Sequence, residues 1–229
     1  MRIKICGMSS QRAVDAAAEL GVEFCGFVFH EASPRNVTPH QVSALDTHGM
    51  KRVGVFVRQS AEEIRDIVRL ARLDYVQLHG SQSADFARAF PAESVIRVLW
   101  PAGCASRKEL EENIAAFAGT CGCYLLDAGM GSGRELDWGA LSGLRFPHPW
   151  FLSGGLGPEN AARALGLCTP DGLDFNSKLE TSPGVKDESL MTQAVERVRL
   201  WEAAGGGAGS AEAERSAACA VCGPEGDTL

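Results

Sequence analysis

Several residues with reactive side chains come directly after short apolar runs of the sequence. Cys6 ends "IKIC", His79 follows "VQL" and Asp127 ends "YLL". A thiol, an imidazole and a carboxyl group can each donate or accept a proton during a reaction. A thiol can also be a small buried residue, half of a disulfide or a metal ligand. The elements that position these side chains decide between the alternatives.

A second group of residues at the ends of apolar runs is suited to binding an anion. Gly154 and Gly155 follow "FLS", and Pro158 comes soon after, at the expected start of a helix. Backbone N–H groups in such a turn are available to a phosphate. Other polar residues stand at equivalent positions after apolar runs: Ser33, Pro34, Arg35, Asn176, Ser177 and Lys178. Together these residues predict a phosphorylated small molecule as the substrate.

Eight strand-like runs alternate with helical patterns along the chain. The strands are expected at residues 3–6, 24–29, 51–57, 75–80, 94–100, 122–127, 149–155 and 172–177. The helical patterns include residues 9–21, 60–73, 82–90, 106–117, 136–144, 158–165 and 187–201, with another beginning at Pro39. Near-continuous apolar strands that alternate with helices are typical of a parallel sheet covered on both faces. Eight such units predict a closed (β/α)8 barrel, whose working residues lie at the C-terminal ends of the strands.

An open, doubly wound sheet is the alternative fold. It is disfavoured because "CGMSS" follows the first strand, where a dinucleotide-binding fold would have G-x-G-x-x-G. We expect one barrel domain over residues 1–204. Residues 205–229 are rich in Gly, Ala, Ser and Glu and have almost no large apolar side chain, which predicts a disordered tail. Cys219 and Cys222 form a C-x-x-C in this tail but lack the second pair that a zinc site usually needs.

The composition of the 229 residues narrows the class of protein further. The hydrophobic content of 45% supports a sizeable core, and no apolar run approaches the ~20 residues of a membrane helix. A short, polar start without the features of a signal peptide predicts a cytoplasmic protein, whose eight cysteines stay reduced. The net charge of −7 comes without a run of Lys or Arg, which disfavours nucleic acid as a partner.

The ordered series of motifs resembles the phosphoribosylanthranilate isomerase family of tryptophan biosynthesis. The motifs are "KICGM", "GFVFHEASPRNV", "VGVFV", "VQLHG", "LLDAGMGSGRELDW", "FLSGGLGPENAARAL" and "DFNSKLETSPGVKD", and they cover about residues 2 to 200. The resemblance implies an Amadori rearrangement of N-(5-phosphoribosyl)anthranilate to 1-(2-carboxyphenylamino)-1-deoxyribulose 5-phosphate. It also implies that no metal or organic cofactor takes part. We expect a monomer or a homodimer.

The resemblance assigns roles to particular residues of this chain. Cys6 matches the general base of the family and Asp127 its general acid. Arg35 matches an arginine that is expected near the anthranilate carboxylate, where its planar fork can pair with two oxygens. Phosphate-binding positions are matched by Gly154, Gly155 and Ser177. His79 is a further candidate for substrate binding, or it completes a hydrogen-bond network around Gln77.

Two segments depart from the family pattern. The family often has Ser-Gly-Val-Glu where residues 177–180 read Ser-Lys-Leu-Glu, and "AGMGSG" after Asp127 is a compact loop. Lysine does not readily take positive φ, so we expect ordinary φ at Lys178 and an ammonium that reaches the phosphate, or one that is solvated or paired with Glu180.

Two other functions are weighed against this one. A bifunctional histidine and tryptophan isomerase would be expected to have aspartate at position 6. A barrel that has lost catalysis is disfavoured because Cys6 and Asp127 are both present.

Overall fold

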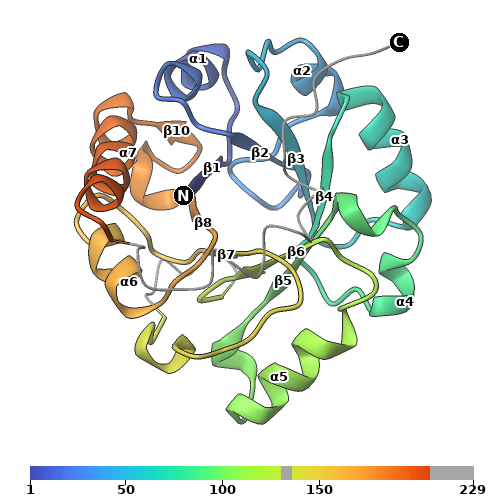
Figure 1. The fold of residues 1–229 in the computed structure, drawn as a ribbon. Coiled ribbons are helices and arrows are strands. Elements are labelled where there is room, and N and C mark those ends of the chain that lie inside the picture. Colours follow the sequence, from blue (N-terminus) through green and yellow to red (C-terminus); the bar gives the residue numbers. More distant parts are fainter. Residues whose placement is uncertain (130–135, 207–229) are drawn as a thin grey trace, which may run out of the picture.

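The chain folds into a closed barrel of eight parallel strands (Figure 1). The structure, a computed structural model, describes residues 1–129 and 136–206. Strands β1 to β8 span Arg2–Cys6, Phe24–Val28, Lys51–Phe56, Tyr75–Leu78, Val95–Leu99, Cys123–Leu126, Trp150–Leu152 and Gly172–Phe175. The barrel closes because β1 pairs in parallel with both β2 and β8. The barrel predicted from the sequence is therefore confirmed.

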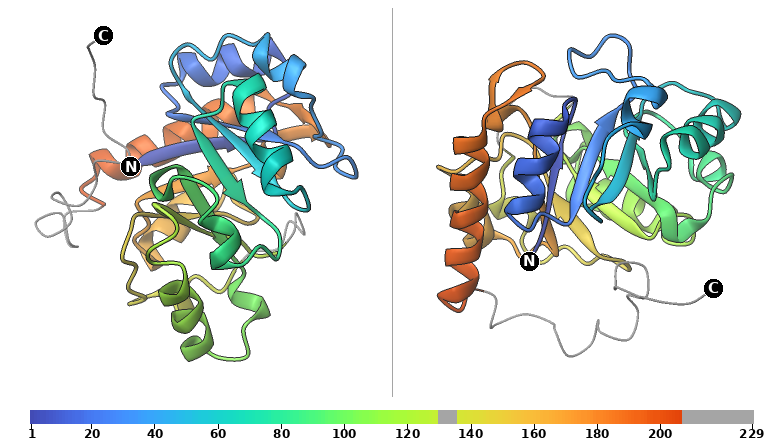
Figure 2. Two further views of the ribbon diagram at one scale, coloured as in Figure 1. Left: turned by 90° about the vertical axis from the view of Figure 1, so that its right-hand side faces the viewer. Right: turned by 90° about the horizontal axis from the view of Figure 1, so that it is seen from above.

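Helices surround the barrel on its outside (Figure 1), and Figure 2 shows the same helices in two further views. The α-helices α1 to α7 span Gln11–Glu19, Pro39–Ser43, Ala61–Ala71, Ala84–Ala87, Arg107–Ala116, Ala161–Leu167 and Glu188–Ala203. The 3-10 helices η1 to η4 span Ala92–Ser94, Pro101–Gly103, Gly139–Leu141 and Ser177–Leu179. Several helices begin at a side-chain cap; Ser60, for example, accepts from the Glu63 N–H while the Glu63 side chain accepts from the Ser60 N–H. Such a capping box satisfies two backbone donors that the helix cannot pair.

Two expectations for local structure were incomplete. The helix expected at residues 136–144 is only the single turn η3, because the segment contains Gly139 and also Gly143, which takes a φ of +72° that ends helical backbone. In addition, the structure has a small antiparallel hairpin after β8 that the sequence patterns did not predict. Its strands are β9, Glu180–Ser182, and β10, Val185–Lys186.

Side chains along each strand alternate between the helices and the barrel interior. In β1, Ile3 and Ile5 belong to the core between strands and helices, whereas Lys4 and Cys6 face the interior. One end of the interior is filled by an apolar cluster: Phe24, Val53, Tyr75, Ile96, Val98, Cys123, Leu125 and Phe151. This packed plug leaves the opposite end, where the strands finish, as the place for a cavity.

Some expectations from the sequence concern residues outside the described ranges. These are most of the compact loop after Asp127, most of the tail that was expected from residue 205, and the pair Cys219 and Cys222. Within residues 1–129 and 136–206, no helix has the length and apolar character that crossing a membrane requires.

Candidate active site

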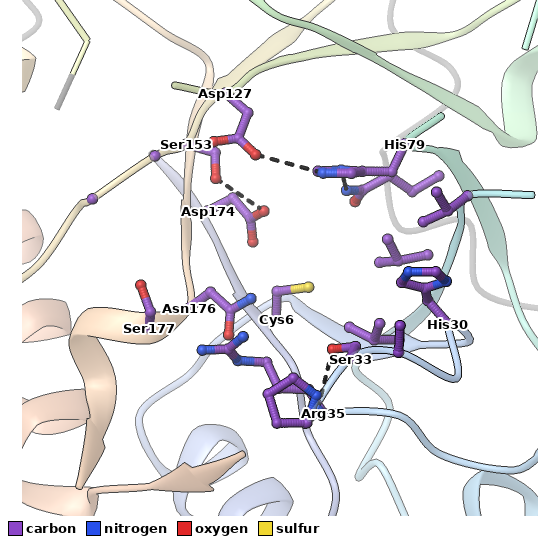
Figure 3. A pocket seen from close by; sticks show the side chains of 18 of the residues that line it. Cys6, His30, Ser33, Arg35, His79, Asp127, Ser153, Asp174, Asn176 and Ser177 are labelled. Carbon is purple, nitrogen blue, oxygen red and sulfur yellow. Dashed lines mark hydrogen bonds and ion pairs between the residues drawn. The ribbon is translucent and has the colours of Figure 1, made fainter. Parts of the chain in front are cut away.

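A cavity of about 590 Å³ opens at the C-terminal ends of the strands (Figure 3). Its lining comes from the strands β1, β2, β3, β4 and β8, and from the residues that follow β2, β3, β4, β6, β7 and β8. The lining contains every residue predicted for the site except Lys178: Cys6, Arg35, His79, Asp127, Gly154, Gly155 and Ser177. Closure of the barrel thus brings together residues that are far apart in the sequence.

Cys6 is the last residue of β1 and is 4% exposed. Gly26 pairs with it on β2, and a Cβ atom at Gly26 would lie 2.8 Å from the Cys6 sulfur. Gly7 turns the chain directly after the thiol with a φ of +75°, and a Cβ there would lie 2.7 Å from Cδ of Arg35. Both glycines therefore leave the space that the thiol and the arginine occupy.

The charge around Cys6 is contributed by several elements. Burial raises the pKa of the Cys6 thiol, and the Asp174 carboxylate raises it further. The ammonium groups of Lys4 and Lys186 act in the opposite direction. Since burial is the largest of these effects, the thiol is the main form of Cys6 near neutral pH.

Asp127 directly follows β6 and faces the cavity from a different side than Cys6, because β7 and β8 separate β6 from β1. Burial raises the pKa of this carboxyl group. The backbone N–H of Gly129 donates to Asp127 Oδ1 over 3.4 Å, which holds the carboxyl in place. A carboxyl whose pKa is raised keeps a proton more readily and is suited to act as a general acid.

His79 lies beside Asp127, with Nε2 3.7 Å from Asp127 Oδ2. Burial, with a smaller contribution from the positive charge of Lys4, lowers the pKa of His79 to about 4. The imidazole is therefore neutral at neutral pH, and its contact with Asp127 is not an ion pair there. Its Nδ1 lies 3.3 Å from the side-chain nitrogen of Gln77, so His79 both lines the cavity and takes part in a network around Gln77.

An ion pair lies at the base of the cavity. The Lys4 ammonium donates to Asp174 Oδ1 over 2.9 Å, and the two side chains are 1% and 5% exposed. Ser153 donates to the other carboxylate oxygen over 3.4 Å. The sequence interpretation missed both charged residues, although a lysine in "RIKIC" and an aspartate in "GLDF" are charges inside otherwise apolar strands, and this signal could have identified them.

Arg35 is held by a carboxylate of the hairpin. Its Nε and Nη2 donate to the two oxygens of Glu180 over 2.8 and 2.7 Å. Lys186 donates to Glu180 over 2.8 Å and to the side chain and carbonyl of Asn176 over 2.9 and 3.1 Å. Glu180 therefore occupies one edge of the guanidinium fork and leaves the Nη1 edge for a ligand.

The glycine turn after β7 has the backbone that an anion site requires. Gly154 and Gly155 take φ values of +91° and +66°, and a Cβ at Gly154 would lie 2.6 Å from the Ala128 nitrogen. Asn160 fixes the following loop, because its side chain accepts from the Gly157 N–H and donates to the Gly155 carbonyl. Ser177, the first residue of η4 after β8, lines the same cavity.

The structure does not bring Lys178 to the cavity lining. Its side chain is 46% exposed and its ammonium lies 3.7 Å from Oε1 of Glu159. Among the described residues, positive φ outside glycine is confined to His48 and Arg72, so the expectation of ordinary φ at Lys178 is confirmed. Glu180, the other partner considered, is engaged with Arg35 and Lys186 instead.

The barrel and its cavity define a class of protein. A protonatable carboxyl, a thiol, an arginine and a glycine turn face one cavity at the C-terminal end of a (β/α)8 barrel, which is the arrangement of an enzyme that transfers protons on a small anionic molecule.

The comparisons with known proteins are more specific. Residues 3–197 match the family model described as N-(5'phosphoribosyl)anthranilate (PRA) isomerase. The isomerase of Desulfovibrio desulfuricans is 50% identical over 198 residues, which are 85% of this chain and 94% of that protein. The crystal structure of the Thermotoga maritima isomerase has a TM-score of 0.78 at 29% identity, covering 87% of this chain and 99% of that one.

A further solved structure of a PRA isomerase contains reduced 1-(o-carboxyphenylamino)-1-deoxyribulose 5-phosphate. It has a TM-score of 0.76 at 28% identity and covers 87% of this chain and 99% of its own. The chain belongs to the phosphoribosylanthranilate isomerase family.

Proposed function

We propose that Asp127 and Cys6 carry out the two proton transfers of the family's reaction. That reaction isomerises N-(5'-phosphoribosyl)anthranilate to 1-(2-carboxyphenylamino)-1-deoxyribulose 5-phosphate in tryptophan biosynthesis, and the chain is accordingly an aldose–ketose isomerase. The observation that carries the assignment is that a buried carboxyl and a buried thiol line one cavity from different strands.

Asp127 acts first, as the general acid. The furanose ring opens when the bond between C1' and the ring oxygen breaks, and the oxygen takes the proton of the Asp127 carboxyl. The electron pair of the anilino nitrogen then forms the C=N bond of a Schiff base. The environment of Asp127 supports this role, because burial raises its pKa and so favours the protonated form.

Cys6 acts second, as the general base. Its thiolate removes the proton on C2', and the electron pair of that bond moves toward the iminium to give an enolamine. Tautomerisation of the enolamine, with a proton added at C1', gives the 2-ketose. The position of Cys6 supports this role, since its sulfur faces the cavity from β1 while Asp127 faces it from β6.

The anionic ends of the substrate have separate partners in the proposal. The N–H groups of the turn at Gly154 and Gly155, with Ser177, bind the phosphate. Arg35 binds the anthranilate carboxylate through its Nη1 edge, because Glu180 already occupies Nε and one proton of Nη2. His79 is neutral, so it contacts the substrate as a hydrogen-bonding group and not as a cation.

Turnover of freshly prepared phosphoribosylanthranilate, followed by the loss of its fluorescence, tests the assignment. We expect Cys6→Ala and Asp127→Asn each to lower kcat by at least about 100-fold, because each removes a proton-transfer group. The matched control is Cys25→Ala, which removes a buried cysteine that does not line the cavity. Near-normal turnover in Cys6→Ala, or an equal loss in the control, contradicts the role of Cys6.

A further inference from the structure

Lys4 is a buried cation that lies beneath the cavity without lining it. It is two residues before Cys6 on β1, so both side chains point into the barrel interior. The side chain of Lys4 is 1% exposed, and its ammonium is fixed 2.9 Å from Asp174. A lysine in this position is not available to the substrate, but it is next to the thiol that the proposed mechanism requires as a base.

The groups that face Cys6 come from each element packed around it. Lys4 lies on its own strand, Asp174 on β8, Lys186 on β10 and Arg35 in the loop after β2, and all four interact electrostatically with the thiol. The side chains that β2 and β3 contribute beside it, Val28 and Val55, are apolar. Arg35 and Lys186 share the carboxylate of Glu180, so their charge is partly cancelled at close range.

We propose that Lys4 is a positioning residue of the isomerase, which stabilises the thiolate of Cys6 from below while Asp174 holds the ammonium in place. The inference rests on the proposed role of Cys6 as the base. Removal of solvent makes a buried thiolate costly, and a cation fixed nearby offsets part of this cost. Asp174 has two opposed effects, because it immobilises the helpful cation and also places a negative charge near the thiolate.

These opposed effects make the proposal testable without an activity assay. Lys4→Met removes the positive charge and should disfavour the thiolate, whereas Asp174→Asn removes the negative charge and should favour it. The rate of alkylation of Cys6 by iodoacetamide, measured between pH 6 and 10 by mass spectrometry of the peptide that contains it, reports the thiolate directly. Because the reaction is read at one site, the other cysteines do not contribute.

We expect Lys4→Met to slow alkylation of Cys6 at pH 7.5 by about 10-fold or more, since a nearby charge changes a pKa by about one unit or more. Asp174→Asn should accelerate it, and Lys4→Arg, which keeps the charge, should stay closer to the wild type. In the pH profile of kcat/KM, the rise that reports the base should move to higher pH in Lys4→Met. The control is Lys108→Met. The side chain of Lys108 is exposed on α5, so this substitution should change neither the alkylation rate of Cys6 nor the pH profile.

A merely structural role for Lys4 predicts a different result. If the ion pair only stabilised the fold, both single variants would loosen the barrel and both would accelerate alkylation, which would overturn the proposal. An unchanged rate in Lys4→Met would also overturn it.

The double variant Lys4→Met with Asp174→Asn leaves no unpaired buried charge and covers the case in which Lys4→Met does not fold. Alkylation of Cys6 in the double variant should be slower than in Asp174→Asn, and an equal alkylation rate would contradict the proposal. Failure of the proposed function would be seen in a different measurement, as retained turnover in Cys6→Ala. That result would leave the alkylation rates of Cys6 in the Lys4 and Asp174 variants unaffected.

Discussion

Burial moves the titratable groups around the cavity toward their uncharged forms. It raises the pKa values of the Cys6 thiol and the Asp127 carboxyl, and it lowers the pKa of His79 to about 4. All three follow from one cause, since a group removed from water loses the solvation of its charged form. A carboxyl that keeps its proton is useful as an acid, whereas a thiol that keeps its proton needs a nearby cation before it can act as a base.

The neutral state of His79 predicts how the stability of the protein depends on pH. Its pKa is about 4 in the folded chain against 6.5 when unperturbed, so the unfolded chain binds more protons between these values. The contribution of His79 to the free energy of unfolding is therefore fully present above about pH 6.5 and is lost as the pH falls toward 4. At pH 4.5 the loss amounts to about 2 to 3 kcal/mol in the free energy of unfolding.

Urea unfolding of the wild type and of His79→Gln at pH 7 and pH 4.5 measures this loss. The wild type should lose about 2 to 3 kcal/mol more than the variant between the two pH values, because glutamine has no charge to acquire. Taking this difference between the two proteins cancels the pH dependence that their shared carboxyl groups contribute to the free energy of unfolding. Equal losses in the two proteins would show that the histidine is protonated in the folded chain without cost.

Gly26 tests the space around the thiol. A Cβ at this position would lie 2.8 Å from the Cys6 sulfur and 3.0 Å from its Cα, so Gly26→Ala must displace the thiol or separate β1 from β2. We expect kcat to fall about 10-fold or more, since small misplacements of a reacting group are costly. The free energy of unfolding should fall by about 1 to 3 kcal/mol. Gly119→Ala is the matched control, because nothing lies within 4 Å of its added Cβ.

At the scale of elements, the hairpin of β9 and β10 links one wall of the cavity to the loop after β2. Glu180 of β9 binds Arg35, and Lys186 of β10 binds both Glu180 and Asn176. Gly184 permits this approach, because a Cβ there would lie 2.7 Å from the carbonyl oxygen of Pro34. The hairpin thus sets the direction of the Arg35 side chain, which lines the cavity.

Glu180→Gln tests this link between the hairpin and Arg35. The change leaves the buried ammonium of Lys186 and the partly buried guanidinium of Arg35 without their carboxylate, so we expect a loss of about 3 kcal/mol in the free energy of unfolding. The KM for phosphoribosylanthranilate should rise about 10-fold while kcat changes less, because the contact proposed for Arg35 would hold the ground state and the transition state alike. Glu159→Gln, which breaks the exposed pair with Lys178, is the control and should leave both constants near their wild-type values. A lower kcat at constant KM in Glu180→Gln would place Arg35 in the chemical step instead.

The sequence predicted these elements to different extents. The strands are identifiable because eight apolar runs repeat with helices between them, and that repetition is a strong signal. The hairpin has strands of three and two residues, which are too short for a periodic pattern, and η3 falls in a glycine-containing segment where a helix was expected. Short elements of this kind are stabilised by contacts that are distant in the sequence, such as the pair of Arg35 and Glu180.

At the scale of the whole molecule, closure of the barrel decides which residues meet. Because β1 pairs with β8, Lys4 reaches Asp174, which lies 170 residues further along the chain. The sequence predicts that the ends of all strands share one mouth, and this places Cys6, Asp127 and the glycine turn around one cavity. It does not predict which pairs touch, because the register between first and last strands is set only when the barrel closes.

The C-terminal residues give the last prediction, which concerns the extent of the functional unit. The family match ends at residue 197, and α7, which ends at Ala203, packs beside the N-terminal strand, with Arg199 donating to the Met1 carbonyl over 2.9 Å. Residues 207–229 have almost no large apolar side chain with which to add to this core.

Deleting residues 207–229 should leave kcat/KM unchanged and shift Tm by less than about 2 °C. Differential scanning calorimetry and the fluorescence assay measure both, and a metal analysis of the two proteins tests Cys219 and Cys222. A fall of many degrees, or stoichiometric zinc that is lost with the deletion, would show that the segment binds to the barrel or holds a metal.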